Sequence, residues 1–260
     1  MIITLVIGSL MGLILINTPV FIALGVSGLI GIYLLNGASG ITALPMVIYS
    51  QVDSFILVAI PLFIFMGEIL ANSGLGKDIF DCLSKWLSRI PGGLAIASTC
   101  ACALFGAACG VSVAGVGAIG PLAVPEMLEK KYDERLAAGS LAAAGALSTL
   151  IPPSIVMVVY GSLSLTSVSK LFIGGIVPGL ILLIMMCIYI LVAVKIKPSL
   201  APSPEIIVNW GDRFRSLKNL IPMILLGIFI MVCLYSGAAT PTEVAAMGSV
   251  GAMIISRFIY

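Results

Sequence analysis

Apolar segments about as long as a bilayer is thick recur along almost all of this sequence. A hydrocarbon core of about 30 Å is crossed by roughly 20 apolar residues in a helix. Such segments lie at about residues 2–16, 18–35, 54–72, 136–160, 171–195, 217–236 and 242–259. Only 9% of the 260 residues are charged and 60% are hydrophobic, which is too little charge to cover a soluble domain. The sequence therefore predicts an all-α polytopic membrane protein.

Charge and residue types exclude several classes of function. A net charge of +2 without a basic block offers nothing to follow a phosphate backbone, which excludes nucleic acid as a partner. The chain has no histidine, and its six cysteines lack the spacing of metal ligands, so no zinc, haem or other cofactor is expected. An intramembrane protease would need a histidine base or a pair of intramembrane aspartates, and the sequence predicts no enzyme.

Two segments differ from the apolar runs. Charged and apolar residues alternate with a helical period over residues 76–90, which predicts an amphipathic helix along the membrane surface. Residues 196–220 contain Pro198, Pro202 and Pro204 and are expected to form a cytoplasmic linker, with a short surface helix around 206–218. Met1 leads into apolar residues without a basic region, so the first segment is expected to remain as a helix.

Residues 93–126 predict a re-entrant helical hairpin. The apolar runs 93–108 and 112–125 flank Gly106–Ser112, neither run is long enough to span comfortably, and both outer ends carry charge. Exposed backbone at such a tip is tolerated only where protein or a cavity surrounds it. One ordinary span with a glycine kink is the alternative.

Lysine and arginine placement favours the hairpin. With the N-terminus outside the cell and a hairpin at 93–126, every lysine and arginine except Lys170 faces the cytoplasm. A spanning segment would instead put the basic groups at 77–89 and 130–135 on opposite faces.

The segment 136–160 is expected to be a broken helix. Pro152 and Pro153 remove two backbone donors and clash with the preceding turn. Free carbonyls and hydroxyls at such a break suit a hard cation, and a helix N-terminus at the hairpin tip favours an anion. A merely kinked helix would explain the two prolines but not the neighbouring hairpin.

At two further places the sequence leaves two functional roles open. Thr240 or Thr242 is expected to cap a helix that begins after Pro241, with Glu243 in its first turn, and an ion role is the alternative. Glu68 is the one acid well inside a predicted span, where it is either interfacial or functional.

At several ordered motifs the sequence resembles the large membrane subunit of TRAP transporters, the tripartite ATP-independent periplasmic carriers of carboxylates. These motifs are Ala59–Glu68 (AIPLFIFMGE), Pro91–Gly93 (PGG), Ile119–Glu126 (IGPLAVPE), Leu150–Ser154 (LIPPS), Leu171–Gly179 (LFIGGIVPG) and Thr240–Glu243 (TPTE). Together they cover nearly the whole chain in the family's order.

The resemblance implies the large permease subunit of a sodium-coupled elevator-type importer in the bacterial inner membrane. Its partners would be a small four-helix membrane subunit and a periplasmic substrate-binding protein that delivers a carboxylate, such as a C4-dicarboxylate or a sugar acid. Sodium, the coupling ion, would lie between the hairpin tip and the broken helix, at Cys109, Gly110, Ser112, Ser148, Thr149, Pro152 and Ser154. The residues expected beside the substrate are Gly106, Pro153, Thr240 and Thr242.

The chain departs from the family pattern at the tip and in length. The family tip usually reads Ser-Gly-Ser-Ser, whereas Cys109–Ser112 reads Cys-Gly-Val-Ser here. A thiol is a poor sodium ligand, but backbone carbonyls remain, so sodium binding stays open. The family builds its site from two inverted repeats. Here residues 1–195 are expected to form the first repeat, 196–220 a linker and 221–260 the start of the second.

A lone first repeat is expected to bind little and to transport nothing by itself. The second half would be truncated, encoded separately or interrupted. Two other readings remain: a stand-alone ion-coupled carboxylate transporter, which would not depend on a binding protein, and a non-transporting membrane fragment that assembles with other subunits.

Overall fold

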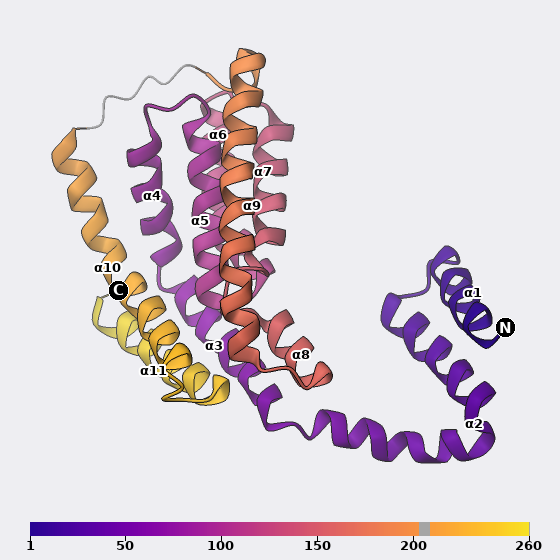
Figure 1. The fold of residues 1–260 in the computed structure, drawn as a ribbon. Helices are drawn as coiled ribbons and strands as arrows, with labels where there is room; N and C mark the ends of the chain where they lie inside the picture. The colour runs from indigo at the N-terminus through magenta and orange to yellow at the C-terminus, as the bar shows by residue number, and fades with distance from the viewer. Residues whose placement is uncertain (203–208, 260) are drawn as a thin grey trace. The chain divides into compact units, whose positions relative to one another are not determined.

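The computed structural model describes residues 1–202 and 209–259, and every regular element within them is a helix (Figure 1). The chain forms two compact units, Met1–Ser54 and a second that begins at Phe55, and each is described by itself. The element bounds are α1 Ile2–Leu15, α2 Val20–Val52, η1 Phe55–Val58, α3 Ala59–Asn72, α4 Leu75–Leu87, α5 Gly93–Cys109, α6 Ser112–Glu129, α7 Glu134–Ser148, α8 Ile155–Ser164, α9 Val168–Ile196, η2 Pro198–Leu200, α10 Trp210–Tyr235 and α11 Pro241–Ile259.

Four stretches of the described residues are long and apolar enough to cross a membrane: Val20–Val52, Phe55–Asn72, Val168–Ile196 and Trp210–Tyr235. The prediction of an all-α polytopic membrane protein is confirmed. The predicted spans at 2–16 and 242–259 are the helices α1 and α11.

The first unit consists of α1 and α2. A β-carbon on Gly31 of α2 would lie 3.1 Å from Val6 Cγ2 of α1, so the two helices pack closely there. α2 has 33 residues and extends well beyond the predicted span 18–35. Gly37 interrupts it with φ 66° and ψ −153°, a backbone conformation open mainly to glycine. Because the helix changes direction at Gly37, a single helical pattern of apolar residues does not continue through all of α2. The sequence therefore predicted only its first part.

In the second unit, α5 is the most buried helix and contacts α3, α4, α6, α7 and α9. Its sequence, GLAIASTCACALFGAAC, is dominated by small residues. Small side chains let neighbouring backbones approach closely, which is how helices associate in lipid without a hydrophobic driving force. The composition of α5 therefore explains its central position.

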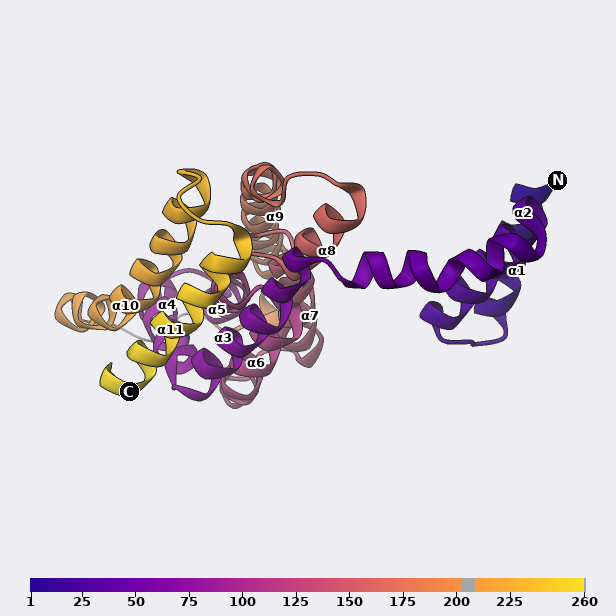
Figure 2. The same cartoon turned by 90° about the horizontal axis from the view of Figure 1, so that it is seen from below.

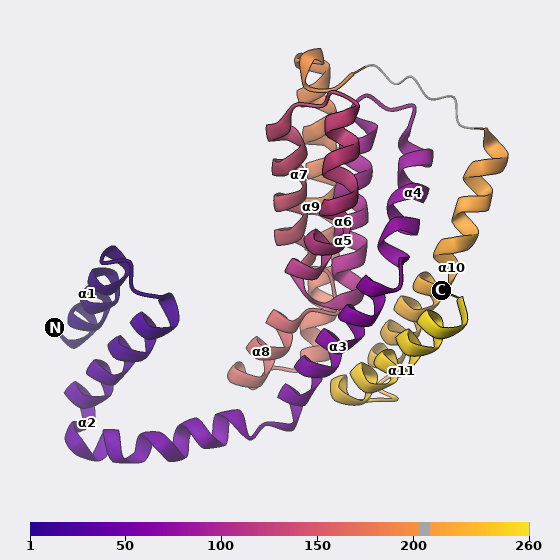
Figure 3. The same cartoon turned by 180° about the vertical axis from the view of Figure 1, so that it is seen from behind.

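The amphipathic helix α4 packs against protein along its apolar face. Leu75, Ile79, Phe80 and Cys82 are buried, and α4 runs beside α5 and contacts α10 (Figures 1 and 3). The sequence predicted a helix lying along the membrane surface. The structure differs because the apolar stripe is covered by neighbouring helices.

The last helix, α11, lies along α3 (Figure 2). Thr242 Oγ1 donates to Phe55 O at 3.2 Å and Ser249 Oγ donates to Leu62 O at 2.8 Å. Residues 209–259, which include the part of the linker from residue 209 on, thus belong to the same compact unit as α3–α9. α10 begins at Trp210 as one continuous helix, so the short surface helix expected at 206–218 is absent from residues 209–218, while 203–208 lie outside the described residues.

Candidate functional site

α5 and α6 form the predicted helical hairpin. Gly110 and Val111 join them, and Gly110 adopts a left-handed conformation (φ 72°, ψ 6°) while its N–H donates to Gly106 O at 2.8 Å. A glycine at this position ends α5 without steric strain. The two antiparallel helices exclude one continuous span with a kink.

The predicted helix break is also present. α7 ends at Ser148 and α8 begins at Ile155, with Pro152 and Pro153 buried between them. Ser154 is fully buried and caps α8, because its Oγ accepts a hydrogen bond from Met157 N at 3.5 Å. The missing proline donors leave the intervening residues 149–154 outside any helix.

The hairpin tip and the helix break meet directly. Ile155 N donates to Gly110 O at 3.1 Å, across 45 positions of sequence. A β-carbon on Gly110 would lie 3.2 Å from Pro153 O, and one on Gly106 would lie 2.3 Å from Ser148 Cβ. The structure therefore brings together five predicted site residues. Gly106 and Gly110 belong to the hairpin, and Ser148, Pro153 and Ser154 belong to the helix break.

Helix ends of both polarities gather at this junction. α5 and α7 end there, and α6 and α8 begin there. Terminal carbonyls carry partial negative charge and terminal N–H groups carry partial positive charge. The junction can thus offer carbonyl oxygens to a cation and N–H groups to an anion.

Two hydroxyls are oriented so that their oxygens remain available. Ser148 Oγ donates to Gly145 O at 2.7 Å and Thr149 Oγ1 donates to Ala146 O at 2.8 Å. A hydroxyl that donates its proton keeps lone pairs with which to accept or to bind a cation. Ser148 is fully buried, and Ser112 is half-buried at the first residue of α6.

Cys109 lies in the tip but its thiol is directed toward α3. Cys109 Sγ lies 3.9 Å from Gly67 O, to which it donates. A β-carbon on Gly67 would lie 2.9 Å from Cys109 Cβ. Sequence reasoning missed Gly67, although a glycine next to Glu68 inside an apolar helix is a signal of close packing. Glu68 itself is exposed.

α9 packs closely against the residues of the helix break. β-carbons on Gly175 and Gly179 would lie 2.7 Å from Leu150 O and 2.8 Å from Ile151 Cγ1. Both glycines belong to the motif Leu171–Gly179. The motif is therefore explained by the close passage of α9 along the interrupted backbone.

Thr240 and Glu243 form a capping box at the start of α11. Thr240 N and Oγ1 donate to Glu243 Oε2 at 2.7 and 2.8 Å, and Glu243 N donates to Thr240 Oγ1 at 3.4 Å. The expected cap is thus confirmed for Thr240. Thr242 instead joins α11 to η1, and proximity of both threonines to substrate stays a prediction.

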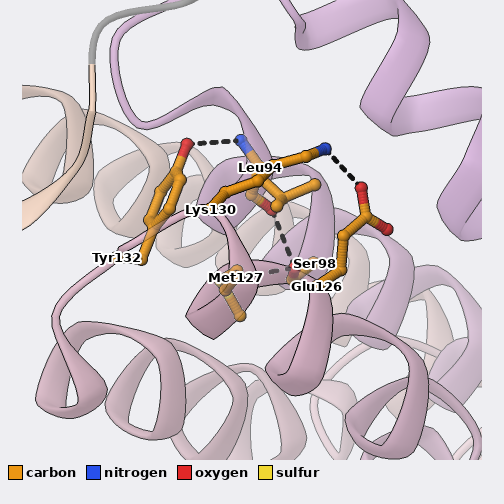
Figure 4. A network of polar contacts seen from close by, with 6 residues as sticks. All are labelled: Leu94, Ser98, Glu126, Met127, Lys130 and Tyr132. Atoms are coloured by element: carbon orange, nitrogen blue, oxygen red, sulfur yellow. Dashed lines mark hydrogen bonds and ion pairs between the residues drawn. The ribbon is translucent and has the colours of Figure 1, made fainter.

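Polar contacts close the open end of the hairpin (Figure 4). Leu94 N donates to Tyr132 Oη at 3.4 Å, Ser98 Oγ donates to Leu94 O at 2.7 Å, and Lys130 pairs with Glu126. Burial raises the pKa of Tyr132 above its ordinary value, because loss of solvent disfavours the charged phenolate. Because Asp133 N also donates to Leu200 O at 3.0 Å, the α6–α7 turn is joined to η2, which follows α9.

Comparison with known proteins identifies the family of this chain. Residues 7–260 match the family model of the tripartite ATP-independent periplasmic transporter, DctM component. A C4-dicarboxylate TRAP transporter large permease protein of Pseudomonas aeruginosa is 38% identical over 240 residues, 92% of this chain and 55% of that protein. An ectoine TRAP transporter large permease protein of Halomonas elongata is 29% identical over 99% of this chain and 60% of its own length.

An isethionate TRAP transporter permease protein of Oleidesulfovibrio alaskensis is 34% identical over 94% of this chain and 38% of its own length. The chain thus spans about half the length of the curated large permeases that it matches. Family membership rests on the match over nearly the whole chain. The chain belongs to the DctM component family of tripartite ATP-independent periplasmic transporters.

Proposed function

We propose that this chain contributes the hairpin and broken helix of the large permease subunit of a sodium-coupled carboxylate importer in the bacterial inner membrane. The observation that carries the proposal is the hydrogen bond between Gly110 O and Ile155 N, which fixes the hairpin tip on the helix break. A small membrane subunit and a periplasmic binding protein complete the importer, and the N-terminus faces the periplasm.

Sodium would be held by oxygen atoms at the meeting helix ends. Hard cations prefer carbonyl and hydroxyl oxygens, and Ser148 Oγ and Thr149 Oγ1 keep lone pairs free after donating within α7. Gly110 O, which accepts one hydrogen bond, has a second lone pair. The thiol of Cys109, which is directed toward Gly67, takes no part in this ligand set.

The substrate carboxylate would lie near the N-terminal ends of α6 and α8. The N–H groups of a first helical turn attract an anion, and a bound cation nearby strengthens that attraction. Relatives are named for C4-dicarboxylate, ectoine, sialic acid and isethionate. The most similar of the relatives described above handles C4-dicarboxylates, which favours that class here.

Transport is tested with a chimera. This chain replaces the aligned part of the Pseudomonas aeruginosa C4-dicarboxylate permease, in a strain that lacks that permease but keeps the rest of its transporter. We expect uptake of radiolabelled succinate that depends on a sodium gradient, on the binding protein and on the chimera. The 260-residue chain alone should give none.

Two results would overturn the proposal. One is a chimera that reaches the membrane in normal amounts but does not restore uptake, or restores it equally with potassium. The other is uptake by the 260-residue chain alone, without a binding protein, which would favour a stand-alone carrier.

A further inference from the structure

A buried guanidinium lies where the end of α4 meets the start of α10. Arg213 is only 5% exposed, and its Nη2 donates to Ser88 Oγ at 3.2 Å. Its guanidinium carbon lies 5.1 Å from the centroid of the Trp210 ring. Its Nε is buried and has no hydrogen-bond partner within the part of the chain that the structure describes.

Among the residues that the structure describes, the positive charge of Arg213 has no neutralising carboxylate. Arginine does not lose its proton in proteins, so burial cannot be relieved by deprotonation. A hydroxyl and an aromatic face stabilise a cation but carry no negative charge. The Lys130–Glu126 ion pair does not involve Arg213, and no ion pair of Arg213 is found within residues 1–202 and 209–259. The site therefore calls for an anion.

The residues around Arg213 are of the types that occur at the depth of the lipid headgroups in a membrane. Trp86 Nε1 donates to Arg213 O at 3.2 Å, and the Trp86 ring meets Phe214 edge-on at 5.9 Å. Arg89, an exposed second cation, lies 5.9 Å from the Trp210 ring. Trp210 and Phe214 are themselves 54% and 60% exposed. Tryptophan together with arginine is characteristic of the interface between hydrocarbon and water, where lipid phosphates lie.

We propose that Arg213, Ser88 and Arg89 hold the phosphate of an anionic phospholipid at the α4–α10 junction. The guanidinium of Arg213 supplies the charge and a planar fork of donors, which suits the several oxygens of a phosphate. Arg89 supplies a second charge from the exposed side, and the exposed rings of Trp210 and Phe214 lie against the lipid. This inference is independent of the transport proposal.

The test uses the full chain in detergent, with phosphatidylglycerol added and phosphatidylcholine as the reference lipid. Native mass spectrometry counts bound lipid for Arg213→Gln and for Arg215→Gln, which removes the same charge from an exposed position on α10. We expect Arg213→Gln to weaken phosphatidylglycerol binding about tenfold or more and Arg215→Gln to leave it nearly unchanged. Arg213→Lys should be intermediate, because it keeps the charge but loses the fork of donors.

Several outcomes would overturn the proposal. Equal binding to the Arg213→Gln and Arg215→Gln variants would mean unspecific attraction to basic residues. Loss of bound phosphatidylglycerol when inorganic phosphate is added would identify a free anion rather than a lipid. If Arg213→Gln does not fold, unchanged phosphatidylglycerol binding in both Arg213→Lys and Ser88→Ala would refute the site.

Discussion

Gly106 of α5 lies directly against Ser148 of α7, so closely that a β-carbon on Gly106 would come within 2.3 Å of Ser148 Cβ. Real β-carbons do not approach one another to this distance. The contact joins the hairpin tip to the last residue before the helix break. The position of Ser148, and with it the candidate cation site, therefore depends on a glycine at 106.

Gly106→Ala is expected to destabilise the second unit. The added methyl group meets the fixed base of a side chain, and overpacking of this kind typically costs about 1–3 kcal/mol. Thermal unfolding in detergent measures the change. Gly117→Ala on α6 is the matched control, because a β-carbon there meets nothing within 4 Å. Equal stability of the two variants would contradict the close contact.

Tyr132→Phe is expected to weaken the open end of the hairpin. It removes the oxygen that accepts from Leu94 N, and a lost hydrogen bond to a part-buried donor costs about 1 kcal/mol. Hydrogen exchange at the start of α5 should become faster. Tyr160→Phe, at an exposed position on α8, should leave exchange in α5 unchanged. Identical exchange in both variants would argue against the Leu94–Tyr132 bond.

Thr240→Ala is expected to loosen the start of α11. The variant loses one half of the capping box with Glu243, which typically costs about 1 kcal/mol. Thr240→Ser keeps the hydroxyl and should retain most of the stability. Thermal unfolding of the two variants measures their stability. An equal loss of stability in both would show that the hydroxyl does not cap the helix.

Cys100 of α5 and Cys187 of α9 should form a disulfide on mild oxidation. Their sulfur atoms lie 3.6 Å apart, across 87 positions of sequence. Copper phenanthroline treatment followed by peptide mass spectrometry detects the linkage. Cys187→Ser should abolish it, whereas Cys102→Ser should not. Absence of the linkage in the unmodified chain would contradict the packing of α5 against α9.

Local signals in the sequence predicted the hairpin and the helix break better than they predicted the packing around them. The hairpin follows from glycines between two short apolar runs, and the break follows from Pro152 and Pro153, because each effect acts over a few residues. An amphipathic pattern says only that one face of α4 is covered. It does not say whether lipid headgroups or α5 and α10 cover it.

Other features depend on contacts between residues distant in sequence. The thiol of Cys109 is directed toward Gly67, 42 positions away, which no motif at the tip reveals. Thr242 was considered a cap or an ion ligand, but its hydroxyl reaches Phe55 O, 187 positions away. The buried charge of Arg213 likewise depends on the approach of α4 to α10.

The central claim is that the hairpin tip and the helix break together form a sodium site, and sodium activation of the chimera tests it most directly. Succinate uptake is measured against sodium concentration for the chimera and for its Ser148→Ala and Gly117→Ala variants. We predict that Ser148→Ala raises the sodium concentration for half-maximal uptake about tenfold, because a buried oxygen ligand is lost, while Gly117→Ala changes it little. Unchanged sodium activation in Ser148→Ala, with the variant present in the membrane at normal amounts, would contradict the account.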